Sequence, residues 1–180
     1  IGHGLYLTPE DREILNTRGA YLAHNARSNM NNHVGYNATL PQVKNVVLGT
    51  DGIGSDIFTE AKFAYFRHRD AGGPLGPGAF MRFVQAGNDI LHRSFGESFG
   101  RVAEGYKADL VVLDYDAPTP LSRENVAGHY IFGMGSRDVS SVIVNGAIVM
   151  ENRSFRFDAG AVYAQGQAQA RALWQKMDRL

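Results

Sequence analysis

A carboxylate set among glycines follows one of the apolar stretches of the sequence. Residues 46–48 are Val-Val-Leu, typical of a short buried strand, and Asp51 follows in the run Gly-Thr-Asp-Gly. Most acids in such turns cap a helix or accept hydrogen bonds from nearby backbone amides, so a structural role is one interpretation. The other is chemical: Gly49 and Gly52 would let the backbone turn sharply and present the acid as a metal ligand or a base.

Phosphate and nucleic-acid binding have little support in the sequence. The run after residue 48 has no Gly-Lys-Ser/Thr, and Gly52-Ile53-Gly54 lacks the third glycine of a dinucleotide fingerprint. Eighteen basic residues balance eighteen acidic ones, and no strip of Lys and Arg stands out. We therefore expect neither a nucleic-acid partner nor a membrane-surface partner.

Metal chemistry has more support, because polar side chains occur in three successive predicted strands. His3 is in the first, His24 and Asn25 end the second, and Asp51 ends the third. The carboxyl ends of parallel strands gather functional side chains at one edge of a sheet. A carboxylate with imidazoles suits zinc or ferrous iron, whereas a single histidine in a strand is more often an ordinary core residue.

The elements that would position these residues alternate between strands and helices, which predicts a parallel α/β sheet. Apolar periodicity, capping residues and turn residues give their approximate bounds. We expect strands over 2–7, 20–25 and 45–51, helices over 9–17, 57–69 and 79–93, and a long polar loop over 26–41.

The pattern changes after about residue 100. Residues 108–116 read as a strand that ends in turn residues, and 139–150 read as a hairpin joined by Asn145-Gly146, a pair that tolerates a type I′ turn. A helix is expected over 159–180. We therefore divide the chain into an α/β region, 1–100, and a small β region with a closing C-terminal helix, 101–180.

Composition bears on the cellular location expected for the protein. The absence of cysteine excludes disulfides and thiolate metal sites, and fits a cytoplasmic protein. No run approaches the roughly 20 apolar residues that a membrane helix needs. We therefore expect a cytoplasmic location and no membrane partner.

Several stretches resemble the amidohydrolase superfamily. IGHGLYLTPEDREIL, AHNARSNMNN and VVLGTDG, in this order, are similar to its late barrel strands, and EGYKADLVVLDYD with VSSVIVNGAIVM is similar to its carboxy-terminal β-sandwich. The closest resemblance is to the cytosine/guanine deaminase and chlorohydrolase branch, and within it to aminohydrolases associated with selenium metabolism. It implies the last strands and helices of a metal-dependent (β/α)8 barrel plus part of a small β-sandwich with a C-terminal helix.

The resemblance also implies roles for individual residues. Asp51 corresponds to an aspartate that binds the metal and shuttles a proton. His3 corresponds to a histidine that contacts the metal-activated water or the substrate, and in some members the metal itself. His24 is expected to support the site rather than bind the metal. Three residues correspond to a motif beside the substrate pocket: Asn25, Ser28 and Asn29.

The implied activity is hydrolysis of a C–N bond, in particular deamination of a purine-like or pyrimidine-like N-heterocycle by a metal-activated water, with zinc as the expected metal and iron as the alternative. Two other activities fit the same residues, namely opening of a cyclic amide and displacement of halide. A non-catalytic scaffold that keeps the fold without the metal is a third alternative.

Part of the family's site has no counterpart in the sequence. The superfamily's His-x-His pair, a further histidine and a catalytic glutamate would precede Ile1, and no His-x-His occurs in the 180 residues. We therefore expect the carboxy-terminal part of a metal-dependent hydrolase, inactive alone. Half a barrel exposes sheet edges, so its expected partner is a missing amino-terminal half, another chain or a second copy of itself.

Overall fold

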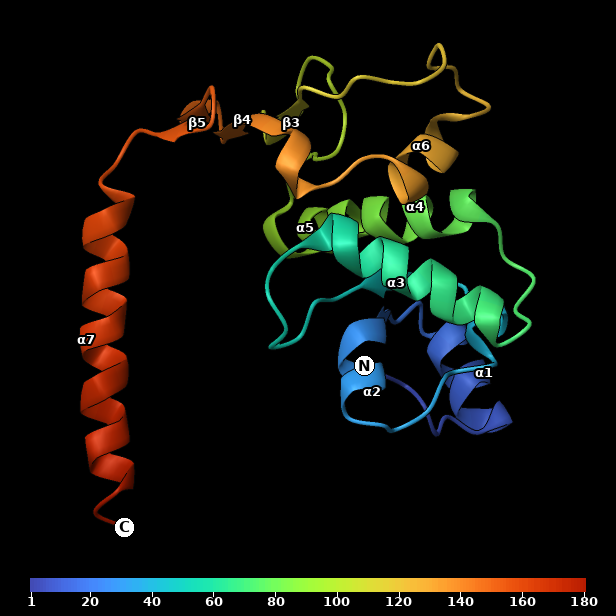
Figure 1. Cartoon of the computed structure of the whole chain (residues 1–180). Coiled ribbons are helices and arrows are strands. Elements are labelled where there is room, and N and C mark those ends of the chain that lie inside the picture. The colour runs from blue at the N-terminus through green and yellow to red at the C-terminus, as the bar shows by residue number, and fades with distance from the viewer. The chain divides into compact units, whose positions relative to one another are not determined.

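The computed structural model describes residues 1–180, which form two compact units (Figure 1). The first unit contains residues 1–107 and 114–138, and the second contains residues 108–113 and 139–180. Both strands and helices are present, so the chain is α/β. No helix is both long and apolar enough to cross a membrane.

A small parallel sheet lies in the first unit. Strands β1 (Leu22–His24) and β2 (Val46–Leu48) pair in parallel. The start of the chain adds a third parallel segment, since the Ala23 N–H donates to the Ile1 carbonyl (2.8 Å) and the His3 N–H donates to the Ala23 carbonyl (2.9 Å). All three segments therefore end on the same side.

The first predicted strand, 2–7, is wrong beyond its first residues. Only Gly2 forms a bridge with the sheet, and the backbone then turns through left-handed conformations at His3 (φ 63°) and Gly4 (φ 60°). At Gly4 an added Cβ would lie 2.3 Å from Leu22, so glycine is required there for space as well as for conformation.

Helix α1 (Pro9–Thr17) confirms the capping prediction. The Thr8 hydroxyl accepts a hydrogen bond from the Asp11 N–H (3.1 Å), and the Asp11 carboxylate accepts one from the Thr8 N–H (2.9 Å), which completes a capping box. Leu15 is buried in a cluster with Leu22 of β1. α1 is thereby held against the sheet.

The loop predicted over 26–41 is wrong in its first part, where helix α2 (Ala26–Asn31) forms, and a short 3-10 turn follows at Leu40–Gln42. Ala26, Ser28 and Asn29 are buried. The asparagine-rich composition hid this helix, because its stability comes from tertiary packing rather than from intrinsic propensity.

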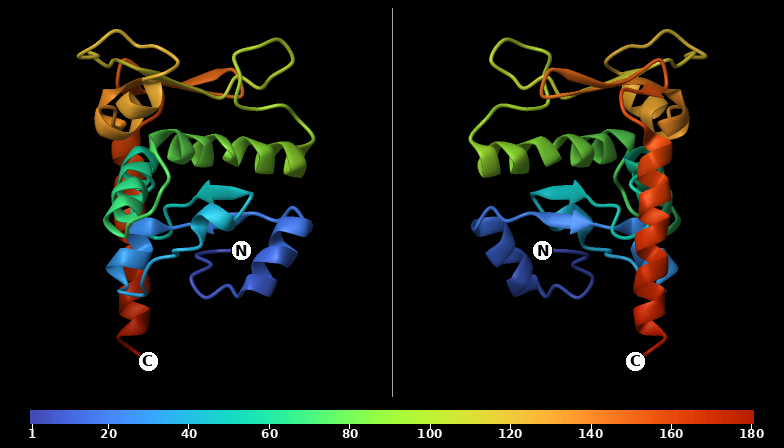
Figure 2. Two further views of the ribbon diagram at one scale, coloured as in Figure 1. Left: turned by 90° about the vertical axis from the view of Figure 1, so that its right-hand side faces the viewer. Right: turned by 90° about the vertical axis from the view of Figure 1, so that its left-hand side faces the viewer.

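Four further helices complete the first unit. α3 (Ile57–Asp70) confirms the predicted helix and is capped by the Asp56 carboxylate, which accepts from the Thr59 N–H (3.0 Å). The single helix predicted over 79–93 is two, α4 (Pro77–Gln85) and α5 (Gly87–Phe95), and α6 (Val126–Phe132) was not predicted. Figure 2 shows α4 and α5 running along one side of the strands. One apolar core joins α2, α3, α4 and α6: Ala26, Ala61, Ala64, Ala79, Phe80 and Ile131.

The second unit is an antiparallel sheet followed by a helix. Its strands, in spatial order, are β3 (Leu110–Leu113), β4 (Val139–Val144), β5 (Ala147–Glu151) and β6 (Ser154–Phe155). The predicted hairpin is confirmed, with positive φ at both turn residues, Asn145 (48°) and Gly146 (80°). A 3-10 turn (Ser136–Asp138) precedes β4, and α7 (Ala159–Met177) ends the chain.

Candidate functional site

The structure brings all five of the predicted site residues together. His3 Nδ1 lies 2.8 Å from Asn29 Oδ1, and His3 Nε2 lies 3.5 Å from both Asn25 Nδ2 and Asp51 Oδ2. The Ser28 hydroxyl donates to Asp51 Oδ2 at 2.7 Å. We refer to these five residues as the His3–Asp51 cluster.

The cluster forms at the carboxyl ends of the parallel segments. His3 ends the first segment, Asn25 directly follows β1, and Asp51 lies in the turn after β2. Helix α2, which starts after Asn25, adds Ser28 and Asn29 from one helical turn. Segments far apart in the sequence thus supply the cluster, as expected for parallel strands.

Two members of the cluster have a strained backbone that the sequence did not predict. Asp51 has φ 51° and His3 has φ 63°, both in the left-handed region. Such a conformation costs a non-glycine residue about 1–3 kcal/mol and is typical of functional sites. The only sequence signal was the composition around each residue, which is rich in glycine.

The role expected for the flanking glycines is wrong in part. Gly52 is a central residue of the turn together with Asp51, but neither Gly49 nor Gly52 has positive φ; the left-handed residues of this loop are Asp51 and Gly54 (φ 47°). Gly49 has a different function, since an added Cβ would lie 2.3 Å from Asn25 Oδ1. Glycine at position 49 therefore makes room for the Asn25 amide under the turn.

Three side chains of the cluster are buried, and the other two are exposed to solvent. Asn25, Ser28 and Asn29 are 8%, 3% and 2% exposed, whereas the side chains of His3 and Asp51 are 42% and 40% exposed. The buried amides and hydroxyl therefore fix the imidazole and the carboxylate, while both remain accessible to a ligand.

Hydrogen bonding orients the His3 imidazole. Asn29 Oδ1 can only accept, so the neutral ring carries its proton on Nδ1 and donates it to Asn29. The Nε2 lone pair is then free to accept from Asn25 Nδ2, on the side where Asp51 lies. This nitrogen is the one that a metal or a substrate proton would meet.

The Asp51 carboxylate is held in its ionised form. The hydrogen bond from the Ser28 hydroxyl, followed by the one from the Gly52 N–H (2.7 Å), lowers the pKa of Asp51 below its usual value of 3.8, and the positive charge of His3 adds a smaller effect when its ring is protonated. At neutral pH the group is therefore an anion that can bind a cation or accept a proton.

The donor set fits a zinc ion in type but not in number. Two ligands about 2.1 Å from one tetrahedral zinc would be roughly 3.4 Å apart, close to the 3.5 Å between His3 Nε2 and Asp51 Oδ2. However, the chain has no group of three or more His, Cys, Asp or Glu side chains placed to hold a metal. A catalytic zinc usually has three protein ligands, so these two residues form only part of a site.

His24 is buried near the cluster and has no hydrogen-bond partner. It is 1% exposed, and neither ring nitrogen is bonded. Burial, followed by the proximity of His68 and His3, lowers the pKa of His24 to about 4. The ring is therefore neutral at physiological pH, and it is buried next to the cluster with neither nitrogen hydrogen-bonded.

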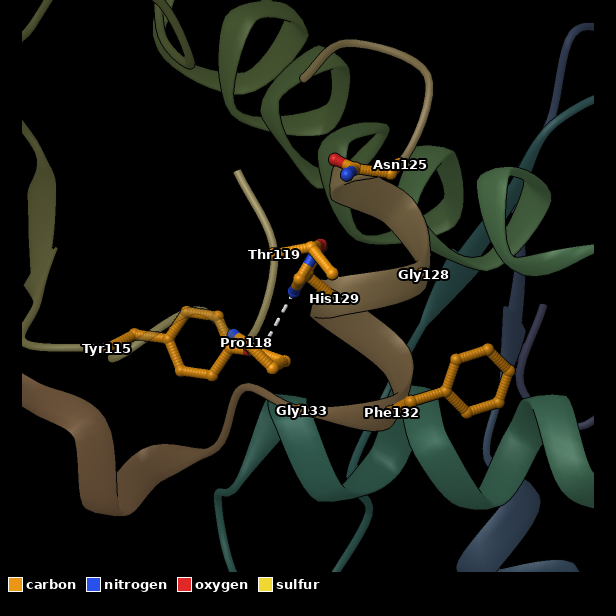
Figure 3. A pocket seen from close by; sticks show the side chains of 8 residues that line it. All are labelled: Tyr115, Pro118, Thr119, Asn125, Gly128, His129, Phe132 and Gly133. Atoms are coloured by element: carbon orange, nitrogen blue, oxygen red, sulfur yellow. Dashed lines mark hydrogen bonds between the residues drawn. The ribbon is translucent and has the colours of Figure 1, made fainter. Parts of the chain in front are cut away.

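Two other histidines have both ring nitrogens bonded. His68 contacts the Tyr36 hydroxyl through Nδ1 and accepts the Leu75 N–H at Nε2 (2.8 Å). His129 contacts the hydroxyls of Tyr115 and Thr119, each at 3.0 Å. The His129 ring lines a cavity of about 390 Å³ over α6 (Figure 3), which therefore offers no free imidazole nitrogen.

Sequence comparisons relate the chain to deaminases. Residues 1–149 match the model of the Amidohydrolase family. The 5-methylthioadenosine/S-adenosylhomocysteine deaminase of Desulfitobacterium hafniense strain DCB-2 is 33% identical over 159 residues, covering 84% of this chain and 37% of the relative. That of Syntrophomonas wolfei is 31% identical over 182 residues, covering 95% and 42%. The chain thus spans about two fifths of the length of these relatives.

Solved structures show the same fold relationship. A zinc-bound adenosine deaminase from Xanthomonas campestris superposes with a TM-score of 0.78 at 23% identity, over 97% of this chain and 42% of that one. A variant of atrazine chlorohydrolase from Arthrobacter aurescens TC1, also with zinc, gives 0.75 at 21% identity, over 93% and 39%. With the family match over most of its length, the chain belongs to the amidohydrolase family.

Proposed function

We propose that the chain supplies the Asp51 and His3 side of a metal-dependent active site that hydrolytically deaminates an N-heterocycle. The observation that supports this proposal is the His3–Asp51 cluster, in which an ionised carboxylate and an oriented imidazole lie 3.5 Å apart at the ends of parallel segments. The relatives named as deaminases support a substrate of the adenine type, an aromatic ring with an exocyclic amino group.

Each residue of the cluster has a part in the proposed reaction. Asp51 takes a proton from the attacking water and passes it to the departing amino group, so that water and the ring amine become a ring carbonyl and ammonia. His3 holds the substrate or the water through Nε2. Asn29 fixes the His3 tautomer, Ser28 lowers the pKa of Asp51, and Asn25 lies beside His3.

The metal would be held by Asp51 and, in one arrangement, by His3. A zinc ion supplies Lewis acidity, which lowers the pKa of a coordinated water toward ~7. Zinc-bound relatives of the same fold support this metal, and iron fits the same ligands. The remaining ligands would come from residues outside this chain, because the described residues offer only these two.

We further propose that residues 1–100 form the carboxy-terminal part of a (β/α)8 barrel and residues 101–180 a portion of a β-sandwich closed by α7. Two short parallel strands and one flanking segment leave open edges in the first unit. A sheet of this size needs further strands to pair with its open edges, which favours completion by another segment, another chain or a second copy.

The test is an assay of the protein expressed from its complete gene and loaded with zinc, against adenosine-type, guanine-type and cytosine-type amines. Ammonia release with one water oxygen transferred to the ring is the expected result. Chloride release from a chlorinated triazine, or ring opening of a cyclic amide, without deamination would replace the proposed reaction by another hydrolysis. Zinc binding with no turnover of any of these classes would contradict it.

A further inference from the structure

A buried ion pair joins α2, the helix that carries Ser28, to α3, and its arginine also contacts the loop that follows Asp51. Arg27 on α2 and Glu60 on α3 pair at 2.6 Å between Nε and Oε2, with side chains 13% and 0% exposed. The pair lies outside the His3–Asp51 cluster, and neither residue is required by the proposed reaction. The arginine nevertheless makes a further contact that bears on the cluster.

Arg27 binds three groups at once. Its backbone N–H donates to Glu60 Oε1 (3.2 Å), its Nε donates to Oε2 (2.6 Å), and its Nη2 donates to the carbonyl of Gly54 (2.7 Å). Glu60 thus fixes the guanidinium, and the guanidinium fixes the turn. The planar fork of arginine suits this geometry, because its nitrogens point at different acceptors from one rigid plane.

The Gly54 carbonyl is a sensitive point of the turn. It also accepts the Asp56 N–H (2.9 Å), and Gly54 itself has φ 47°. Asp51, three residues earlier in the same loop, has a left-handed backbone that needs support from its surroundings. Adjacent residues of α2 therefore hold the turn at two points, with Ser28 on the Asp51 carboxylate and Arg27 on the Gly54 carbonyl.

We propose that Arg27, fixed by Glu60, is a positioning residue that sets the Asp51 carboxylate for the reaction. The inference rests on the proposed function for its catalytic consequence, but the ordering of the turn stands without it. An ion pair with a purely structural role would join α2 to α3 and leave the turn after β2 to order itself.

The primary test is Arg27→Lys. Lysine keeps the charge and can still pair with Glu60, but its single nitrogen cannot reach Glu60 and the Gly54 carbonyl in the same way. Measured by ¹⁵N relaxation on the protein expressed from its complete gene, the backbone order parameters of residues 52–55 should fall from about 0.85 to below about 0.6, while those of α3 stay unchanged. Glu60→Gln, which keeps the shape of the side chain, provides the same test if the lysine variant does not fold.

Asp70→Asn is the matched control. Arg67 and Asp70 form an ion pair at 2.9 Å on the same helix, with Asp70 79% exposed, and this pair makes no contact with the turn. Its loss should leave the order parameters of residues 52–55 at the wild-type value.

Kinetics of the protein from its complete gene separate positioning from stability. Arg27→Lys should lower kcat about 10- to 100-fold with KM within about twofold, a range typical of residues that support a site from behind. A lower melting temperature with unchanged order in residues 52–55 would overturn the proposal. If the turn loosens as expected but the wild-type protein releases no ammonia, the proposed function fails while the ordering role of Arg27 stands.

Discussion

The imidazole of His3 and the carboxylate of Asp51 approach within 3.5 Å from the two outer segments of a three-segment parallel arrangement, and both residues have left-handed backbone conformations. Neither contact nor strain would arise from local sequence alone. Buried side chains on α2 and at the end of β1 hold the pair in place, and each of these supports makes a prediction.

Asn29→Ala should release the His3 ring. The variant removes the acceptor of the Nδ1 proton, so the ring can turn and change tautomer. We expect kcat of the protein from its complete gene to fall about 10- to 100-fold, as is usual when a supporting hydrogen bond to a catalytic or ligating histidine is lost. Asn31→Ala, on the exposed part of the same helix, is the control and should retain the wild-type rate.

Ser28→Ala should raise the pKa of Asp51. The Ser28 hydroxyl is the largest of the effects that lower this pKa, and the Gly52 N–H remains as the next largest. The native pKa of Asp51 lies below its unfolded value of 3.8, so the stability that this carboxylate contributes is present above pH 3.8 and is lost as the pH falls below it. The variant should therefore lose less unfolding free energy on acidification below pH 3.8. Carboxyl ¹³C titration of residues 1–180 measures the pKa directly, and an unchanged value would contradict the assignment.

Gly49→Ala should disturb the cluster, whereas Gly52→Ala should not. A Cβ at position 49 would meet Asn25 Oδ1 at 2.3 Å, which forces the amide or the turn to move, while a Cβ at position 52 has nothing within 4 Å. We expect the first variant to lose about 1–3 kcal/mol of unfolding free energy, the usual cost of overpacking a buried site. Chemical denaturation of both variants checks this, and equal stability would show that the turn adapts freely.

His24→Leu should reduce the dependence of the unfolding free energy on pH between 4 and 6.5. In the unfolded chain this histidine has a pKa near 6.5, whereas in the fold burial lowers it to about 4, so the unfolded state binds the extra proton between these values. The unfolding free energy should therefore fall as pH drops from 6.5 to 4, by about 3 kcal/mol from His24. Leucine removes this contribution.

Denaturation at several pH values between 4 and 7 measures that slope. His33→Asn is the control, since position 33 is exposed and asparagine tolerates its positive φ of 53°. A slope in His24→Leu as steep as in the wild type would mean that the buried ring does not remain neutral.

Residues 1–180 expressed alone should hold no stoichiometric catalytic metal. The chain offers two zinc ligands, the Asp51 carboxylate and the His3 imidazole, so the third protein ligand of a catalytic zinc site is lacking. Metal analysis after dialysis should therefore find well under one zinc or iron per chain, with no ammonia release from cytosine or guanine. One tightly held ion per chain would reveal a ligand beyond Asp51 and His3.

The parts of the fold that the sequence predicted are those with strong local signals. The capping box at Thr8, the periodic apolar face of α3 and the Asn145-Gly146 turn each specify local structure through nearby residues. The end of the first strand and helix α2 were missed, because left-handed φ at His3 and the burial of an asparagine-rich helix depend on contacts with distant segments.

The membership of the candidate site was predictable, but its support was not. Residue types at strand ends and the family resemblance pointed to the five members of the cluster. The clearance at Gly49, the tautomer set by Asn29 and the clamp of Arg27 on Gly54 are pairings between separate elements, which spacing along one sequence does not reveal.

Ammonia release by Asp51→Asn tests the central claim most directly. The measurement compares this variant with the wild type, both expressed from the complete gene, loaded with zinc and assayed for bound metal. Asparagine keeps the shape of the side chain and can still accept from Ser28, but it cannot take a proton from water. We predict that turnover falls by at least about a thousandfold while the fold is retained. A metal-loaded variant that keeps a sizeable fraction of the wild-type rate would contradict the role assigned to Asp51.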